Sequence, residues 1–514
     1  MKAWYLVLLL LLYVIESHGQ LRFANYFSDN MVLQRAPQRA VVWGYGDTDV
    51  ITTLTMNNKI YKTRSESKIN EKVGASIWSV TLDAESDEGP FEVVVTQPLA
   101  NGTLASIALK NVLYGDIWVC SGQSNMQWPV SQVFNGSTEI ANAGNYPKIR
   151  LFGVARVGAA APVEEIPSIG MKWSVASSSV VGNGYASAVC WMYGRMIHTA
   201  LNGRPIGLIN TSWGGTAIEL WMPRQALTDC GITKKKKAKK DIDDFEGLEK
   251  VSATNTELYN GMIYPFTRMV VTGAIWYQGE SNAGYNRDKY ICTFSKMITY
   301  WRQVWNTRTN GITNLQFPFG FVQLSTNRNS TSFVGGFPWI RWYQTFGIGY
   351  VPNNVVPNVF MAAAMDLRDD PGGIHPRTKT DVCYRLSRAG LAVAYGQQVE
   401  YQGPIVSNVV VSSASSTIEV SYTNVTAIEF RNPNGFEICC QGATCATNDN
   451  AWLLVTASSK SSLSVSLSIP SSCASSTIYG IRYLWRETPC DFKQAAVYSA
   501  TDANLPSPPY LKVF

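Results

Sequence analysis

Four segments of the sequence place hydroxyl, amide, carboxylate or imidazole groups directly after apolar runs. They read CSGQSN at residues 120–125, TSWGGT at 211–216, YQGESN at 277–282 and a loop that begins at Asp366 and ends at His375. A hydroxyl nucleophile, backbone N–H donors at glycine-containing turns and a nearby base are the components of an acyl-transfer site. The chain contains no GxGxxG, no Walker lysine and no HExxH. These residues therefore predict acyl transfer that needs no metal and no cofactor.

The chain has three histidines, which narrows the choice of a base. His18 lies in an N-terminal leader, and His198 falls in a helical stretch, where we expect a satisfied helix histidine. His375 follows an apolar strand in the loop DDPGGIHPRTK. If a Ser–His mechanism operates, His375 is the base.

Apolar strands alternating with helical segments must position these groups. Uninterrupted apolar runs occur in DIWVCSG, RPIGLIN, TGAIWYQ, FPFGFVQ and NVFMAAAMD, and amphipathic segments such as SAVCWMYGRMIHTALN and DKYICTFSKMITYWRQVW lie between them. Such runs predict a parallel sheet with helices on both faces. Because ligands bind at the carboxyl ends of the strands in these sheets, the four polar segments should share one site.

The regions before and after this α/β region have a different pattern. Short alternating segments such as DVITTLTM and PFEVVVTQ are separated by Gly, Asp and Asn turns, which predicts an N-terminal β-sandwich-like module. The last hundred or so residues are again β-like and rich in cysteine. We therefore divide the 514 residues into an N-terminal module at 20–110, an α/β catalytic domain at 111–399 and a C-terminal β-rich module at 400–514.

Residues 1–19 predict a secretory signal peptide. Lys2 precedes an apolar run that is too short to span a membrane, and small residues precede a cleavage point after Gly19. Ten cysteines agree with an oxidising compartment, and the adjacent Cys439 and Cys440 should have different partners. Sequons for N-glycosylation occur at Asn101, Asn135, Asn210, Asn329 and Asn424, of which Asn210 should be buried and unmodified. We expect a secreted or lysosomal protein without a membrane span.

The net charge of +6 owes much to one segment, KKKKAKK at 234–240, within a loop expected at 231–250. Acidic residues follow the lysines directly, and no aromatic residues lie among them. We interpret this segment as a solvated surface loop and not as a nucleic-acid site.

Several motifs together resemble the sialate O-acetylesterase family of SGNH-type hydrolases. They are GQSNM at 122–126, SWGGT at 212–216, WYQGESN at 276–282 and IHP at 374–376, and the likeness extends to RFANYFSDNMVLQ, GPFEV and IRYLW. The resemblance implies a three-layer α/β/α SGNH-hydrolase-like catalytic core with a parallel sheet, flanked by N-terminal and C-terminal β-rich modules. It also implies hydrolysis of O-acetyl esters of sialic acids, notably at O-9.

The resemblance further implies which residues do the chemistry. In that family the serine of GQSNM is the nucleophile and the histidine before proline is the base, which gives Ser124 and His375 here. Ser121 lies nearer the strand and outside the matching position. The expected oxyanion donors are the N–H of Ser124, an N–H of the Gly214–Gly215 turn, and a side chain of the third motif, either Gln278 or Asn282.

Two features of the site are left open by this pattern. Many SGNH hydrolases place an orienting acid three residues before the histidine, but that position is Gly372 here. The candidates for this role are Glu280, Asp366, Asp369, Asp370 and a backbone carbonyl of the loop. Sialic acid also carries a carboxylate, for which Arg377 and Arg368 are candidate partners.

Two other functions fit parts of the same pattern. The first is an esterase that removes acetyl groups from another polysaccharide such as xylan, since the acetyl group is common to both substrates. The second is a secreted carbohydrate-binding protein with an inactive hydrolase core. The presence of both Ser124 and His375 argues against the second.

Overall fold

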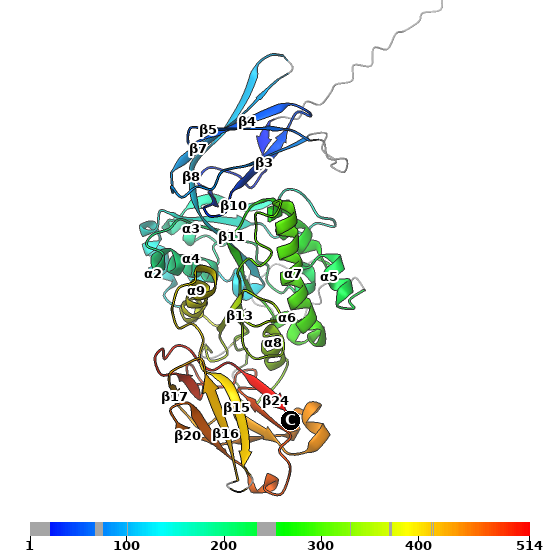
Figure 1. Ribbon diagram of the computed structural model, residues 1–514, viewed down its shortest axis with the longest axis vertical. Helices are drawn as coiled ribbons and strands as arrows, with labels where there is room; N and C mark the ends of the chain where they lie inside the picture. The colour runs from blue at the N-terminus through cyan, green and yellow to red at the C-terminus, as the bar shows by residue number, and fades with distance from the viewer. Residues whose placement is uncertain are drawn as a thin grey trace, which may run out of the picture.

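The computed structural model describes residues 21–66, 76–99, 101–233, 253–328, 330–369, 373–412, 414 and 416–514. The expected signal peptide, the lysine run, Asn329 and Asp370 lie outside these ranges. Three parts follow one another along the long axis of the molecule (Figure 1): a β-rich N-terminal part, a central α/β part and a β-rich C-terminal part. No helix of the described residues is long and apolar enough to cross a membrane.

The central part is built on one twisted sheet. Its strands lie in the order β10 (Ile169–Val175), β9 (Ile149–Val154), β11 (Ile206–Asn210), β8 (Leu104–Gly122), β12 (Gly273–Tyr277), β13 (Phe319–Gln323) and β14 (Val359–Ala363). Neighbours from β9 to β14 are parallel, and every residue of β11, β12 and β13 is buried. The predicted α/β architecture is confirmed. Among these seven strands, the edge strand β10 departs from the parallel arrangement, because it pairs antiparallel with β9.

Helices cover both faces of this sheet (Figure 1). On one side lie α4 (Ala188–Ala200) and α9 (Lys379–Tyr395), and on the other lie α5 (Arg224–Asp229), α7 (Tyr290–Arg308) and α8 (Phe337–Gln344). The α4 helix begins after Ser187, whose hydroxyl accepts a hydrogen bond from the Cys190 N–H at 3.1 Å. Its last turn holds the buried His198, whose Nδ1 lies 2.7 Å from the Arg204 carbonyl oxygen, as expected for a satisfied helix histidine.

One strand joins the N-terminal part to the central sheet. The outer half of β8 alternates between exposed and half-buried residues, whereas its inner half, from Val112 to Gly122, is buried throughout. Its outer half pairs with β7 (Phe91–Pro98), which continues to β4 (Ile51–Met56) and β5 (Lys59–Arg64). A second sheet contains β1 (Arg22–Phe23), β3 (Val41–Gly46) and β6 (Ser76–Thr81), and β2 (Val32–Gln34) pairs parallel with β8. The strand therefore runs through the boundary that we expected near residue 110.

The C-terminal part consists of antiparallel strands. One sheet has the order β15 (Ile405–Ser412), β16 (Thr417–Thr423), β21 (Ser464–Ser468), β20 (Ala457–Ser461). Another has the order β19 (Trp452–Val455), β18 (Phe436–Cys439), β22 (Gly480–Tyr483), β24 (Tyr510–Val513), and β17 (Ile428–Phe430) pairs with β23 (Val497–Ser499). Apolar residues of these strands form a second core, to which Met365 of the central part also contributes.

Disulfides occur in both the central and the C-terminal parts. Within the described residues they are Cys120–Cys190, Cys230–Cys292, Cys439–Cys445 and Cys440–Cys473. Cys439 and Cys440 thus have different partners, as predicted. The first of these bonds joins β8 to α4 four residues before Ser124. Disulfides of this kind are typical of proteins of the secretory pathway.

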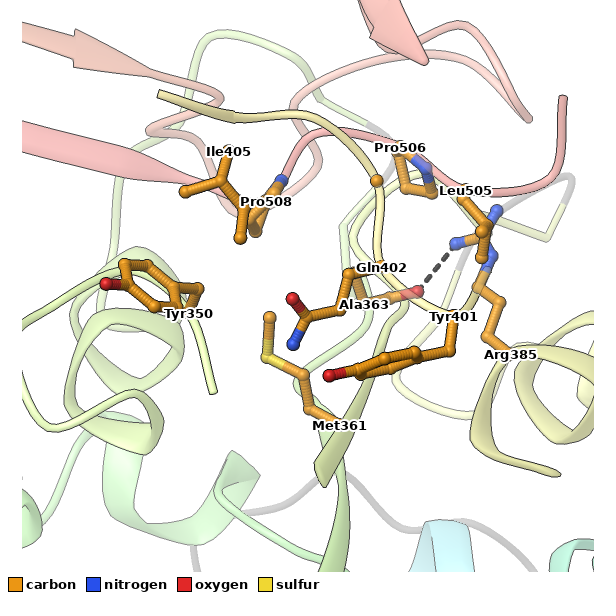
Figure 2. A pocket seen from close by; sticks show the side chains of 11 residues that line it. Tyr350, Met361, Ala363, Arg385, Tyr401, Gln402, Ile405, Leu505, Pro506 and Pro508 are labelled. Atoms are coloured by element: carbon orange, nitrogen blue, oxygen red, sulfur yellow. Dashed lines mark hydrogen bonds between the residues drawn. The ribbon is translucent and has the colours of Figure 1, made fainter. Parts of the chain in front are cut away.

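Between the central and C-terminal parts lies a cavity of about 20 Å³, which has room for about one water molecule. Figure 2 shows the side chains around it, including Met361 and Tyr401, with Arg385 donating a hydrogen bond to the Ala363 carbonyl oxygen at 2.6 Å. This cavity is too small for a sugar, so it is no candidate for the substrate site.

Candidate active site

The nucleophile segment, residues 122–128, begins where β8 ends at the carboxyl edge of the sheet. Gly122 has φ +140°, and a Cβ atom there would lie 2.2 Å from the carbonyl oxygen of Tyr277, so only glycine fits. The next N–H, that of Gln123, donates to the same oxygen at 3.0 Å. The chain then turns into the short helix α1 (Ser124–Gln127), whose first residue is Ser124. Its N–H is therefore one of the first-turn donors that a helix itself leaves unpaired.

The base loop, residues 373–378, contacts the nucleophile segment. The side-chain amide of Asn125 donates to the carbonyl oxygen of Ile374 at 2.8 Å. The rings of Trp128 and His375 are stacked, with centroids 4.4 Å apart and planes at 20°. Ser124 and His375 are thereby brought to the same edge of the sheet, although the chain between them is long.

The second motif, residues 211–216, lies along the other side of the nucleophile segment. The Trp213 N–H donates to the carbonyl oxygen of Gly122 at 3.0 Å. The Gly214 N–H donates to Oε1 of Gln127 at 2.6 Å. The Gly214 N–H, which we expected to donate to an oxyanion, thus donates to a side-chain carbonyl oxygen of the protein.

The third motif begins after β12 and continues into α6 (Glu280–Ala283). Gln278 Nε2 donates to Thr216 O at 3.2 Å and to Asn282 Oδ1 at 2.7 Å. Asn282 Nδ2 donates to Glu219 Oε2 at 3.0 Å and to Tyr285 O at 3.2 Å. These bonds hold the second and third motifs together and use the hydrogens of both amides. A side-chain oxyanion donor from this motif remains only a prediction.

The carboxylates considered as orienting acids have different surroundings. Asp366 is fully buried and is held by Arg385 and by the Tyr498 hydroxyl, so it faces the C-terminal part. Asp369 forms an ion pair with Arg377 at 2.6 Å. Glu280 accepts a hydrogen bond from Asn125 at 2.5 Å, which places it directly beneath the nucleophile segment.

Both arginines considered for the substrate carboxylate pair with acids of the protein. The Arg368 guanidinium lies 2.7 Å from Asp491 of the C-terminal part. Arg377 pairs with Asp369 and also lies over the ring of Phe134, 4.5 Å from its centroid. Their role as substrate contacts stays a prediction.

Burial sets the protonation of the central groups. It lowers the pKa of His375 to about 3, and the positive charge of Lys379 adds to this effect. Burial also lowers the pKa of Lys379 to about 7, against the opposing effect of the Glu280 carboxylate, and it raises the pKa of Glu280. His375 is therefore neutral at ordinary pH.

Sequence reasoning missed four residues that connect these motifs: Asn125, Gln127, Trp128 and Lys379. Three of them belong to the same GQSNMQW segment as the nucleophile, and their position beside Ser124 was the signal that could have found them. Lys379 Nζ lies 2.6 Å from the Asn125 side-chain oxygen, but the two residues are 254 positions apart. No local pattern marks that contact.

Two family models match the chain. Residues 114–389 match the family described as carbohydrate esterase, sialic acid-specific acetylesterase. Residues 407–514 match the sialate O-acetylesterase C-terminal domain.

Similar proteins agree with these matches. The chain is 38% identical over 514 residues to a sialate O-acetylesterase from Homo sapiens, covering 98% of this chain and 95% of the relative. It is 37% identical over 535 residues to a sialate O-acetylesterase from Mus musculus, covering 98% and 97%. The crystal structure of a carbohydrate acetylesterase from Xanthomonas citri superposes with a TM-score of 0.76 at 26% identity, covering 96% of this chain and 99% of the other.

Proposed function

The chain belongs to the sialic acid-specific acetylesterase family of carbohydrate esterases, and on that premise we propose that it hydrolyses O-acetyl esters of sialic acids, notably at O-9. The observation that carries the proposal is the meeting of all four motifs at the nucleophile segment. Asn125 contacts the base loop and Glu280, and Gln127 contacts Gly214.

In the proposed mechanism Ser124 is the nucleophile and His375 the general base. Neutral His375 takes the hydroxyl proton of Ser124 while the serine oxygen attacks the acetyl carbonyl carbon. The carbon–oxygen bond to the sugar then breaks, and the sialic acid oxygen leaves with the proton from His375. Water, activated by the same imidazole, hydrolyses the acetyl-enzyme and releases acetate.

The proposed oxyanion donors are backbone N–H groups of Ser124 and of the Gly214–Gly215 turn. Each such donor typically stabilises the transition state by about 3 kcal/mol. Because the Gly214 N–H donates to Gln127 Oε1, this part of the proposal requires the Gln127 side chain to turn away so that the acetyl oxygen takes its place.

The substrate class is tested by comparing two acetylated carbohydrates. We expect kcat/KM for acetate release to be at least about tenfold higher on 9-O-acetyl sialic acid than on acetylated xylan, because only a matched site uses the other groups of the sugar. The Ser124→Ala variant measures the background release of acetate from both substrates. A preference for xylan would show that the chain acts on another polysaccharide.

The pH dependence of kcat/KM tests the base. An ordinary histidine loses its basic form below about pH 6.5, but burial and Lys379 lower the pKa of His375 to about 3. On 4-nitrophenyl acetate, which does not ionise in this range, kcat/KM should stay within about threefold between pH 7 and 5, because it reports the free enzyme. A tenfold loss per pH unit that starts near pH 6.5 would contradict this prediction.

The lowered pKa of His375 also makes the stability of the folded chain depend on pH. The unfolded chain binds this proton below about pH 6.5 and the folded chain only near pH 3. Folding is therefore weakened by this residue as pH falls through that interval.

We propose a lysosomal or extracellular destination. Disulfides in both the central and the C-terminal parts support it, together with the leader-like first residues of the sequence. A neutral base at acidic pH would suit an acidic compartment.

A further inference from the structure

We propose that Lys379 is a positioning residue for ester hydrolysis, which acts through the Asn125 side chain to fix the base loop against the nucleophile segment. The proposal rests on the proposed function, since it takes Ser124 and His375 as the reacting pair. Neither Lys379 nor Asn125 takes part in the chemical steps given above. Both are 1% exposed.

Every polar atom of the Asn125 side chain has a partner. Its Nδ2 donates to Glu280 Oε1 at 2.5 Å and to Ile374 O at 2.8 Å, and its Oδ1 accepts from Lys379 Nζ at 2.6 Å. These partners allow one orientation of the amide, because a half-turn would place its oxygen against the Glu280 carboxylate and the Ile374 carbonyl. Lys379 therefore selects the orientation in which Asn125 holds the residue directly before His375.

Packing alone does not account for a lysine at this position. Lys379 is the first residue of α9, and the groups that face it are Glu280 on α6, Tyr277 at the end of β12, Asp369 after β14 and Cys383 one turn further along α9. The Tyr277 ring centroid lies 5.1 Å from its ammonium. A buried ammonium is costly compared with an apolar side chain of similar length. The hydrogen bond from the Lys379 side chain to Asn125 gives a functional reason for a lysine at this position.

Lys379 also acts on His375 through space. Its positive charge is the second cause, after burial, of the lowered pKa of His375. The charge keeps the resting imidazole neutral but disfavours the imidazolium that forms when His375 takes the serine proton. The contribution to catalysis that the proposal assigns to Lys379 is therefore the orientation of Asn125 and the base loop.

The test uses Lys379→Met and Asn125→Asp in the full chain, with Lys296→Met as the matched control. Lys296 is partly exposed on α7 and pairs with Asp229 at 3.3 Å, far from the base loop in the sequence. We expect Lys379→Met and Asn125→Asp to lower kcat on 4-nitrophenyl acetate by roughly ten- to a hundredfold, as for a misplaced reacting group. KM should change by less than about threefold, because the binding groups are untouched.

A second readout follows the imidazole directly. Of the three histidines, His18 lies in the predicted signal peptide, so ¹³C-labelled His375 can be assigned by comparison with His198→Gln. In Lys379→Met its pKa should rise by about one unit, because a nearby like charge is gone. A lysine with a structural role only would change the melting temperature and leave kcat per folded molecule as it is.

Wild-type kcat in Lys379→Met, or an unchanged His375 pKa in that variant, would overturn the proposal. A loss of activity that only follows the unfolded fraction would also overturn it. Failure of the proposed function looks different, since Ser124→Ala would then retain the activity.

Discussion

Ser124→Ala is expected to reduce acetate release to background while the protein still folds and is secreted. Loss of a serine nucleophile in a hydrolase lowers kcat by about 10⁶-fold, because its acyl-enzyme route disappears. Only one oxygen is removed, at a side chain that is 2% exposed, so the packing of α1 should persist. The measurement is acetate release from 9-O-acetyl sialic acid, with the melting temperature as the check on folding.

Ser121→Ala is the matched control for this experiment. Ser121 lies three residues earlier, is fully buried, and its hydroxyl has no hydrogen-bond partner among the described residues. Its removal should leave kcat within about threefold and stability nearly unchanged, since no hydrogen bond is lost. If Ser121→Ala were inactive and Ser124→Ala active, the nucleophile would be Ser121. If both variants and the wild type were inactive, the chain would be a binding protein with an inactive core.

The central sheet could be predicted because its strands are buried on both faces. Strands such as β11, β12 and β13 read as uninterrupted apolar runs, and their carboxyl ends carry the polar motifs. The edge strand β10 gave no such signal, since most of its residues are only half-buried. The long strand β8 was also missed as one element, because its outer half alternates while its inner half is continuously apolar.

The sequence allowed a reacting pair to be proposed, and its assignment stays a prediction, but the residues that connect the two segments were not foreseen. Ser124 and His375 could be proposed from residue type and motif, since few histidines were available. The contact between Asn125 and Lys379 depends on how α9 packs against the sheet, and no spacing in the sequence encodes it. The same limit applies to Asp366, whose position before the base loop suggested a catalytic role, while its side-chain contacts are Arg385 on α9 and Tyr498 in the C-terminal part.

Asp366→Asn is expected to destabilise the protein strongly and to change its chemistry little. The Asp366 carboxylate is fully buried. It accepts hydrogen bonds from both terminal nitrogens of Arg385, at 2.6 and 2.9 Å, and from the Tyr498 hydroxyl at 2.7 Å. Removing the charge leaves the buried guanidinium of Arg385 without a counter-charge. Breaking one partner of such a pair typically costs about 3–5 kcal/mol, which corresponds to a loss of roughly 5 °C in the melting temperature of a chain of this size.

If Asp366 were instead the acid that orients His375, Asp366→Asn would affect activity more than stability. If it oriented His375, its conversion to asparagine would lower kcat by about 10⁴-fold, as in a triad whose acid is replaced, and the loss of stability would be secondary. We expect kcat per folded molecule, measured well below the melting temperature, to stay within about threefold of the wild type.

Two further variants show how the loss of stability depends on burial and on the ion pair. Tyr498→Phe removes one hydrogen bond to Asp366 and leaves the ion pair in place, so it should cost about 1–3 kcal/mol. Asp49→Asn is the control for charge loss at the surface, since Asp49 and its partner Arg64 have side chains that are 77% and 57% exposed. An exposed pair contributes at most about 1 kcal/mol. If Asp366→Asn loses the most stability, Tyr498→Phe less and Asp49→Asn the least, Asp366 links the central sheet to the C-terminal strands. Equal losses of stability in Asp366→Asn and Asp49→Asn would contradict this role.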